Sequence, residues 1–463
     1  MGLTMQSGLR ERLAHLLRRA GLSAHPNEVE RLLPLGLEGA VDYLLDYENR
    51  EDPIDDAEIL AFLQGESPRL QPPMVANWWL YRMLVTRRPL QERMAFFWHN
   101  HFATSASKVG DGRLLLMQIQ MFQRLALADF KTLVLEVSKD PAMLVWLDGV
   151  RNVKGKPNEN FARELMELFT MGIGNYTERD IQEAARAFTG WSYSRVTGSF
   201  VFNRNQHDDG EKEVLGKRDN FRGEDIVAMV VEHPATAKHM ARKFYTHFIN
   251  DVDRPDERAI EELARAFTES GYSVRVLMRR LLLSYAFWSP ANYRRRIKSP
   301  AEFVVGTLRQ LGVGERLREA SLNRGAGQRL IANYLRLASQ WTRRIGQSLL
   351  YPPDVAGWEW GTAWISSTTM LERMQFAEFL LPERGLFGFR NLIELIGSGI
   401  TTTEQLVERL EQILDIKLEP STRAKLKGYL EANGGVAVAG NRRREVLQGA
   451  LQIVLASSEF QMM

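Results

Sequence analysis

The densest set of side chains that could do chemistry lies within residues 139–191. A helix is expected over 158–171, and it would carry Asn160, Glu164 and Glu167 on one face, because these positions lie about one turn apart. Carboxylates that project inward one turn apart hold pairs of metal ions in helical bundles. The pattern therefore indicates either a divalent metal site or a buried network of ion pairs. The cations available for such a network are Lys156, Arg163 and Arg186.

A His-x-His pair, His99 and His101, stands near the end of a helix expected to begin at Pro89. If that helix ends at Asn100, the extended chain beyond it allows both rings to reach one metal ion. If the helix continues, the two side chains are about 200° apart and cannot share a metal. His101 would then be a buried partner of Phe97, and His99 a cation near the helix C-terminus.

Residues 205–212 are expected to form a loop that carries His207 and Asp208 beside two further acidic residues. The loop resembles the opening of a calcium-binding loop, but Gly216 stands where a bidentate Glu should close it. Adjacent carboxylates repel one another unless a cation offsets them. We therefore expect the loop either to fold over helix 158–171 through His207 or Asp208, or to bind an ion.

The segment DGVRNVKGKPNE offers a weaker candidate for anion binding. Lys154 and Lys156 lie just before the start of helix 158–171, where backbone N–H groups favour anions. The spacing of a phosphate-binding Walker loop is absent, as are a nucleophile elbow and a dinucleotide fingerprint.

Charge and cysteine content exclude several classes of protein. The 463 residues include 60 basic and 57 acidic residues, for a net charge of +3, so we expect no nucleic-acid partner. Without cysteine, the chain has no disulfide, zinc–thiolate site or cysteine nucleophile. No apolar run is long enough to span a membrane. The N-terminus lacks a signal segment, which predicts a cytoplasmic location unless an export signal has been removed.

Apolar periodicity predicts a mainly α-helical protein, a multi-helix orthogonal bundle with one small β-hairpin near 191–204. The expected units are a helical body over 1–311, a loop-rich connection over 312–401 and a C-terminal helical unit over 402–463. Trp358, Trp360 and Trp364 lie in the connection, either as core packing or as a docking surface.

Long blocks of the chain resemble an uncharacterised bacterial family, domain of unknown function 1800. They include RRPLQERMAFFWHNHFATSASKV, KPNENFARELMELFTMGIGNYTERDIQEAARAFTGW, HDDGEKEVLG and GQSLLYPPDVAGW. The resemblance covers residues 8–462 and implies no activity. It implies that relatives are often exported and encoded beside a family related to sulfatases.

Two functions from different classes follow. The first is a metal-assisted hydrolase, in which a divalent ion activates water. Its nitrogen ligands or bases would be His99, His101 and His207, and its carboxylates Asp208, Glu164 and Glu167. The second is a non-catalytic binding or assembly partner of a sulfatase-like protein or a surface polysaccharide.

Overall fold

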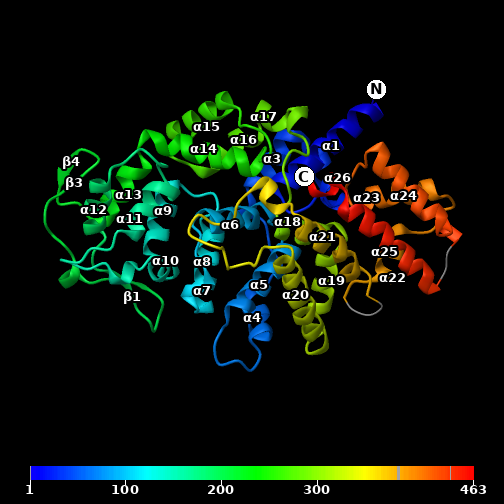
Figure 1. Cartoon of the computed structure of the whole chain (residues 1–463), viewed down its shortest axis with the longest axis horizontal. Coiled ribbons are helices and arrows are strands. Elements are labelled where there is room, and N and C mark those ends of the chain that lie inside the picture. The colour runs from blue at the N-terminus through cyan, green and yellow to red at the C-terminus, as the bar shows by residue number, and fades with distance from the viewer. Residues whose placement is uncertain (1, 383–385, 438–439) are drawn as a thin grey trace.

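The protein is elongated and built almost entirely of helices (Figure 1). This computed structural model describes residues 2–382, 386–437 and 440–463, with side chains for 8–382, 386–437 and 442–463. Helices make up 66% of the protein, so the predicted fold class is confirmed. The four short strands lie at one end of the long axis, and α22 to α25 lie at the other.

The first helices form the centre of the molecule. They are α1 (Gly2–Ala20), α2 (Pro26–Leu32), α3 (Gly36–Leu45), α4 (Asp56–Gln64), α5 (Pro72–Val85), α6 (Pro89–His101), α7 (Ala106–Val109) and α8 (Gly112–Arg124). Every residue of α6 is buried. Trp78 and Trp79 of α5 and Trp98 of α6 are 0% exposed. Burial of such large apolar side chains contributes roughly 2–3 kcal/mol each. α6 also carries charged residues and histidines, and most buried polar atoms find partners inside a protein. Both ring nitrogens of His99 are exceptions, because they have no hydrogen-bond partner within the described part of the protein.

The next segment forms the strand-bearing end. Its helices are α9 (Phe130–Lys139), α10 (Pro141–Trp146), α11 (Asn160–Glu164), α12 (Glu178–Ala187) and α13 (Gly223–Val231). The amphipathic residues 113–138 form two helices, α8 and α9, because Asp129 caps the second by accepting a hydrogen bond from the Thr132 N–H group. The expected capping box at the start of α12 is confirmed, with Thr177 and Asp180 bonded reciprocally.

Two antiparallel hairpins follow α12. The predicted hairpin pairs β1 (Trp191–Tyr193) with β2 (Phe200–Phe202). A second hairpin, β3 (Lys212–Val214) with β4 (Lys217–Asp219), lies where only a loop was expected. Its turn uses positive φ values at both Leu215 (50°) and Gly216 (73°), which matches the tight turns that two-residue hairpins require.

The second half of the chain returns to helices. They are α14 (Pro234–Phe248), α15 (Glu257–Glu269), α16 (Val274–Leu282), α17 (Tyr285–Trp288), α18 (Pro300–Gln310), α19 (Val313–Ser321), α20 (Ala326–Arg344) and α21 (Ser367–Leu380). Residues 312–328, the first part of the loop-rich connection expected over 312–401, are not a loose connection, because α19 and the start of α20 occupy them. Gly314 is a packing residue there, since a Cβ atom would lie 2.2 Å from the Leu84 carbonyl oxygen.

The C-terminal helices are α22 (Phe389–Ile396), α23 (Thr403–Ile413), α24 (Pro420–Ala432), α25 (Gly440–Ala456) and α26 (Ser458–Gln461). The last residues return to the centre, where the Lys298 N–H group donates to the Gln461 carbonyl at 2.8 Å. Arg18 of α1 also pairs with Asp415 at 2.8 Å. The division at 311 and 401 stays a prediction.

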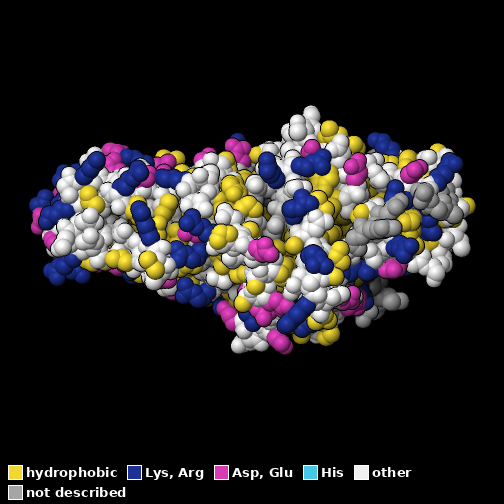
Figure 2. All heavy atoms as spheres, turned by 90° about the horizontal axis from the view of Figure 1, so that it is seen from below, with side chains coloured by type: hydrophobic (Ala, Val, Ile, Leu, Met, Phe, Trp, Pro, Cys, Tyr) yellow, Lys and Arg dark blue, Asp and Glu magenta, His cyan; other side chains and the backbone are white. Residues whose placement is uncertain are grey.

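The charged surface is mixed. Figure 2 shows Lys and Arg side chains spread along the length of one face, with Asp and Glu side chains between them. This distribution agrees with the small net charge of +3.

Candidate functional site

The helix expected over 158–171 changes form halfway. α11 continues into a π turn over Leu165–Phe169. The Met171 N–H group donates to the Met166 carbonyl, five residues earlier, at 3.0 Å. Such turns are frequent at functional sites, and they leave their last carbonyl groups without regular helical partners.

Three nitrogen-bearing side chains from other helices meet those carbonyls. His101 Nε2 lies 3.1 Å from the Phe169 oxygen. Lys243 Nζ donates to the Leu168 oxygen at 3.0 Å, and His239 Nε2 lies 3.3 Å from the same oxygen. Donors and cations stabilise the carbonyl end of a helix, so this cluster is a cap built from α6 and α14.

Burial sets the charge of the cap. It lowers the pKa of His101 far below its usual value and that of His239 to about 4, so both rings are neutral. It also lowers the pKa of Lys243 to about 8. Because His101 Nε2 donates to Phe169, its Nδ1 can accept a hydrogen bond from Lys243 Nζ, 3.1 Å away. Lys243 is therefore the member of the cap whose charge changes near neutral pH.

We expect NMR titration of lysine side chains to show Lys243 losing its proton near pH 8, roughly two units below an exposed lysine. Lys131, whose side chain is 48% exposed, is the matched reference. Since the folded pKa lies below the unfolded one, stability should rise as pH increases from about 8 to about 10. The variant Lys243→Met should show a smaller rise, because the pKa of Lys298, lowered by burial to about 7, also contributes in this range. An ordinary pKa for Lys243 would contradict the buried cap.

Two acidic residues of the same segment, Glu164 and Glu167, remain neighbours, but neither forms an ion pair with a described Lys or Arg. Burial raises the pKa of Glu164, and repulsion by Glu167 raises it further. Glu167 accepts a hydrogen bond from the Tyr176 hydroxyl at 2.6 Å. Among the described residues, no Lys or Arg forms an ion pair with either carboxylate, so the expected ion-pair network is wrong here.

The proposed cations of that network have other partners. Arg163 binds Glu178 at 2.5 Å and Glu159 at 3.5 Å. Arg186 binds Glu183 and Asp208. Glu159 and Glu183 lie within one helical turn of their arginines. Glu178 and Asp208 come from other segments, 15 and 22 residues further along the chain.

His99 and His101 do not converge. α6 continues through His101 instead of ending at Asn100, which turns the two rings to different sides. His99 packs between Trp79 and Trp358, with ring centroids 5.4 and 5.5 Å away. Burial lowers its pKa to about 3, so it is a neutral core residue and not the cation considered for the helix end.

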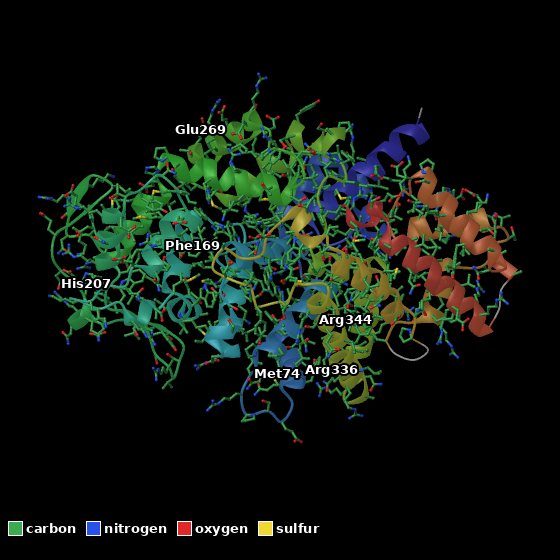
Figure 3. The ribbon with its side chains drawn as sticks, viewed as in Figure 1. Met74, Phe169, His207, Glu269, Arg336 and Arg344 are labelled. Carbon is green, nitrogen blue, oxygen red and sulfur yellow. The ribbon has the colours of Figure 1, made fainter. Side chains whose placement is uncertain are left out.

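The 205–212 loop is anchored to the end of α12 and not to the helix expected over 158–171. His207 is 2% exposed, and its Nδ1 lies 2.9 Å from the Thr189 carbonyl oxygen. Asp208 accepts a hydrogen bond from Arg186 Nε at 2.8 Å, which lowers its pKa to about 2. Lys212 Nζ donates to two carbonyls of the loop. The expectation that the loop covers helix 158–171 is therefore wrong. Figure 3 shows His207 at the end of the molecule, away from Phe169.

The anion site suggested at Lys154 and Lys156 stays a prediction. Both side chains are exposed. The Lys154 N–H group donates to the Gln206 carbonyl at 2.7 Å, and that of Lys156 donates to Val153 at 2.9 Å. An anion would therefore depend on the two ammonium groups, since these backbone donors already have partners.

The tryptophan segment is part of the interior. Trp358 and Trp364 are 5% and 8% exposed. The Trp358 N–H group donates to Asn100 Oδ1 at 2.7 Å. Gly357, with φ of +84°, leaves room for Asn100, because a Cβ atom would lie 2.4 Å from its carbonyl oxygen. Core packing is confirmed for Trp358 and Trp364. Trp360 is half-buried, and the docking surface stays a prediction.

Within residues whose placement is described, no group of three or more His, Asp or Glu side chains is arranged to hold a metal ion. The structure brings together a different set, namely His101, His239 and Lys243. The sequence carries one signal for it, since His239 and Lys243 are spaced i, i+4 on α14.

These features define a helical protein with a histidine- and lysine-capped π turn. The sequence profile described as "Protein of unknown function (DUF1800)" matches residues 15–462, and the chain belongs to this family. No curated protein and no solved structure matches the chain. None of the described helices is long and apolar enough to cross a membrane.

Proposed function

We propose that the protein is a non-catalytic binding or assembly protein rather than a metal-assisted hydrolase. The observation that supports this is the separation of the residues expected to act together. His207 and Asp208 are held at the end of α12, while His99 is enclosed by tryptophans. His101 is committed to the π turn. A shared catalytic site needs these groups within hydrogen-bonding reach of one substrate.

Of the two partners, we propose a surface polysaccharide rather than a sulfatase-like protein. Two adjoining cavities of about 210 and 690 Å³ lie beside α19. The larger is within the usual range for sites that enclose small ligands. Titration with purified saccharides and with a purified sulfatase-like protein, each followed by calorimetry, separates the two partners.

The contacts of His207 provide the sharpest test of the non-catalytic role. Replacement by alanine removes the Thr189 hydrogen bond and leaves a cavity, so we expect a loss of about 2 kcal/mol in the free energy of unfolding. Glu164→Gln should change it by less than about 0.5 kcal/mol, since Glu164 accepts no hydrogen bond from the described residues.

Glu211→Gln is the control on the same loop, because its side chain is 64% exposed. Urea unfolding of the three variants gives the comparison. If His207→Ala left the free energy of unfolding unchanged, and a bound divalent ion were lost from the variant, a metal-assisted hydrolase would replace this proposal.

A further inference from the structure

The two cavities beside α19 form one continuous groove. Four residues line both, namely His25, Asn27, Gly312 and Glu315. The smaller cavity is bounded by α2, the end of α5 and the α18–α19 junction. The larger extends to α22 and α23. We call the whole the α19 groove. It lies where the body meets the C-terminal helices, so one ligand in it would contact both.

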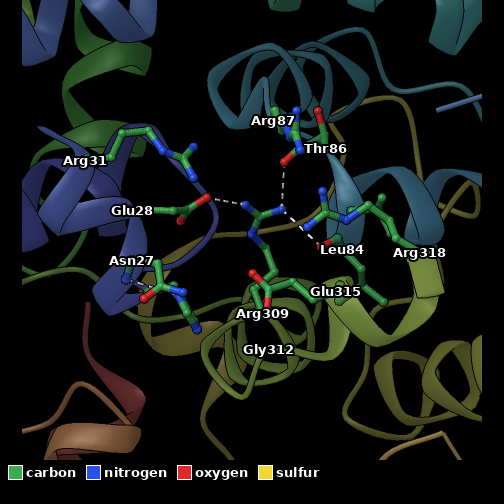
Figure 4. A pocket seen from close by; sticks show the side chains of 13 residues that line it. Asn27, Glu28, Arg31, Leu84, Thr86, Arg87, Arg309, Gly312, Glu315 and Arg318 are labelled. Carbon is green, nitrogen blue, oxygen red and sulfur yellow. Dashed lines mark hydrogen bonds and ion pairs between the residues drawn. The ribbon is translucent and has the colours of Figure 1, made fainter. Parts of the chain in front are cut away.

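The smaller cavity has an unusual excess of guanidinium groups. Its charged lining consists of Arg31, Arg87, Arg309, Arg318, Glu28 and Glu315. Figure 4 shows Arg31, Arg309 and Arg318 extending toward the same space from different elements. Like charges that converge in a cavity repel one another unless opposite charges offset them.

Contacts within the protein account for one of the four arginines. Arg309 is 8% exposed and donates to Glu28 Oε1 at 2.7 Å. Its other terminal nitrogen donates to carbonyls at the end of α5, including that of Met83 at 3.0 Å. Glu28 and the carbonyl end of α5 therefore balance Arg309, but its buried Nε has no partner.

The remaining arginines share the cavity with the carboxylate of Glu315 but are not seen to pair with it. Over the part of the chain that the structure describes, Arg31, Arg87 and Arg318 form no ion pair, since every ion pair found there involves other residues. Arg318 is half-buried, and its Nε is enclosed without a hydrogen-bond partner. Enclosing a guanidinium nitrogen without a hydrogen-bond partner costs free energy. An anion bound in the cavity would remove that cost by pairing with the guanidinium group.

The start of α19 adds donors to the same cavity. Gly312 is its N-cap residue, and no side chain caps the first turn. Gly312 and Gly314 both line the cavity, so no bulky side chain covers the backbone there. Uncapped N–H groups at a helix N-terminus favour anions.

We propose that the α19 groove binds the phosphoryl or sulfuryl group of a larger ligand, with that group in the arginine-lined cavity. This inference rests on the non-catalytic binding role proposed above, and it specifies the chemical class of the ligand. A tetrahedral oxyanion presents three or more acceptor oxygens, which suits guanidinium groups from several directions, whereas a carboxylate presents two. Glu315 would accept hydrogen bonds from hydroxyl groups beside the oxyanion. The rest of the ligand would lie along Leu311, Leu395 and Ile413 in the larger cavity.

The test uses the full chain and inorganic phosphate, inorganic sulfate and acetate as probes, titrated by calorimetry at constant ionic strength. We expect saturable binding of phosphate, sulfate or both, and weaker binding of acetate. Arg318→Gln and Arg87→Gln should each weaken oxyanion binding at least about tenfold, because each removes a charge-assisted donor.

Arg316→Gln is the matched control. It removes the same charge from α19, but Arg316 lines only the larger cavity and pairs with Glu394 at 2.9 Å. It should leave phosphate and sulfate binding unchanged. Preference for phosphate or for sulfate identifies which ester the ligand carries, and either supports the site.

Three results would overturn the site: no saturable binding of phosphate or sulfate, acetate binding as tight as either, or equal weakening in Arg316→Gln. If Arg318→Gln failed to fold, Arg87→Gln would decide, because Arg87 is exposed. A failure here leaves the non-catalytic role standing, since that role is tested by the stability of His207→Ala.

Discussion

Replacing Glu302 by glutamine should lower the free energy of unfolding by roughly 3–5 kcal/mol. The Glu302 side chain is 4% exposed and lies between Arg93 and Arg296, whose side chains are 1% and 2% exposed. It accepts a hydrogen bond from Arg296 at 2.6 Å and one from the Ser299 N–H group at 2.7 Å. Glutamine keeps the shape but removes the negative charge, which leaves two buried guanidinium groups poorly balanced.

The loss of unfolding free energy in Glu302→Gln should be smaller at acidic pH than at neutral pH. Burial opposes ionisation of Glu302, but Arg296 and Arg93 outweigh it and lower the pKa to about 2. In the unfolded chain the pKa of a glutamate is about 4.3. The stabilisation by ionised Glu302 is therefore fully present above that pH and is lost as pH falls toward about 2. Urea unfolding should show the difference between wild type and Glu302→Gln shrinking over that window.

Glu261→Gln is the control, because Glu261 is 61% exposed and its ion pair with Lys238 spans 3.8 Å. A loss below about 1 kcal/mol in Glu302→Gln would show that the two arginines are solvated instead of enclosed.

Replacing Asp140 by asparagine should stabilise the protein in neutral and alkaline solution. Asp140 is 5% exposed, and its Oδ2 accepts hydrogen bonds from Gln118 at 2.7 Å and from the Met143 N–H group at 2.8 Å. No ion pair involving Asp140 is found in the described part of the chain. Burial raises its pKa to about 7, so the charged form destabilises the fold.

The native state therefore holds this proton up to about pH 7, while the unfolded chain releases it near pH 4. Stability falls as pH rises through that window. Asparagine is neutral and can keep both acceptor bonds, so Asp140→Asn should gain on the order of 2–4 kcal/mol above about pH 8 and little below about pH 4.

Asp129→Asn provides the comparison, because Asp129 also caps a helix but is exposed. Chemical unfolding at several pH values should show no pH-dependent gain in that variant. A constant effect of Asp140→Asn across the range would mean that Asp140 is ionised throughout.

Local patterns predicted most of the helices and the first hairpin. Apolar periodicity is set by the core-facing side of each element, so it is visible without knowledge of the neighbours. The capping box at Thr177 and Asp180 is equally local. The second hairpin was not predicted, because Leu215 is a poor turn residue and Lys212 is buried at 1% exposure.

The segment after α18 contains glycines within its helices. Gly314 lies in α19 and Gly327 in α20, where a loop-rich connection was expected. A Cβ atom on Gly327 would lie 2.0 Å from the Ala320 carbonyl oxygen. Close approach of backbone to backbone selects glycine as strongly as a turn does, and the sequence does not distinguish the two causes.

The candidate site depended on contacts that no local pattern encodes. The placement of Glu164 beside Glu167 follows from helical spacing and is supported by their mutual repulsion. The meeting of His101 with Lys243 joins residues 142 positions apart. Likewise, the sequence suggested nothing of the α19 groove, whose arginines come from three separate segments.

The π turn at 165–169 also constrains how chain length can vary among relatives. This turn contains one residue more than a turn of regular α-helix. The hydrogen bond from the Met171 N–H group to the Met166 carbonyl shows this, because it spans five residues instead of four. Losing that residue would rotate everything after it by about 100° and turn the Leu168 and Phe169 carbonyls away from α6 and α14. Insertions and deletions should therefore be rejected at this turn while being tolerated in the exposed turn between β1 and β2. We therefore expect relatives that keep the cap residues His101 and Lys243 to keep this extra residue as well.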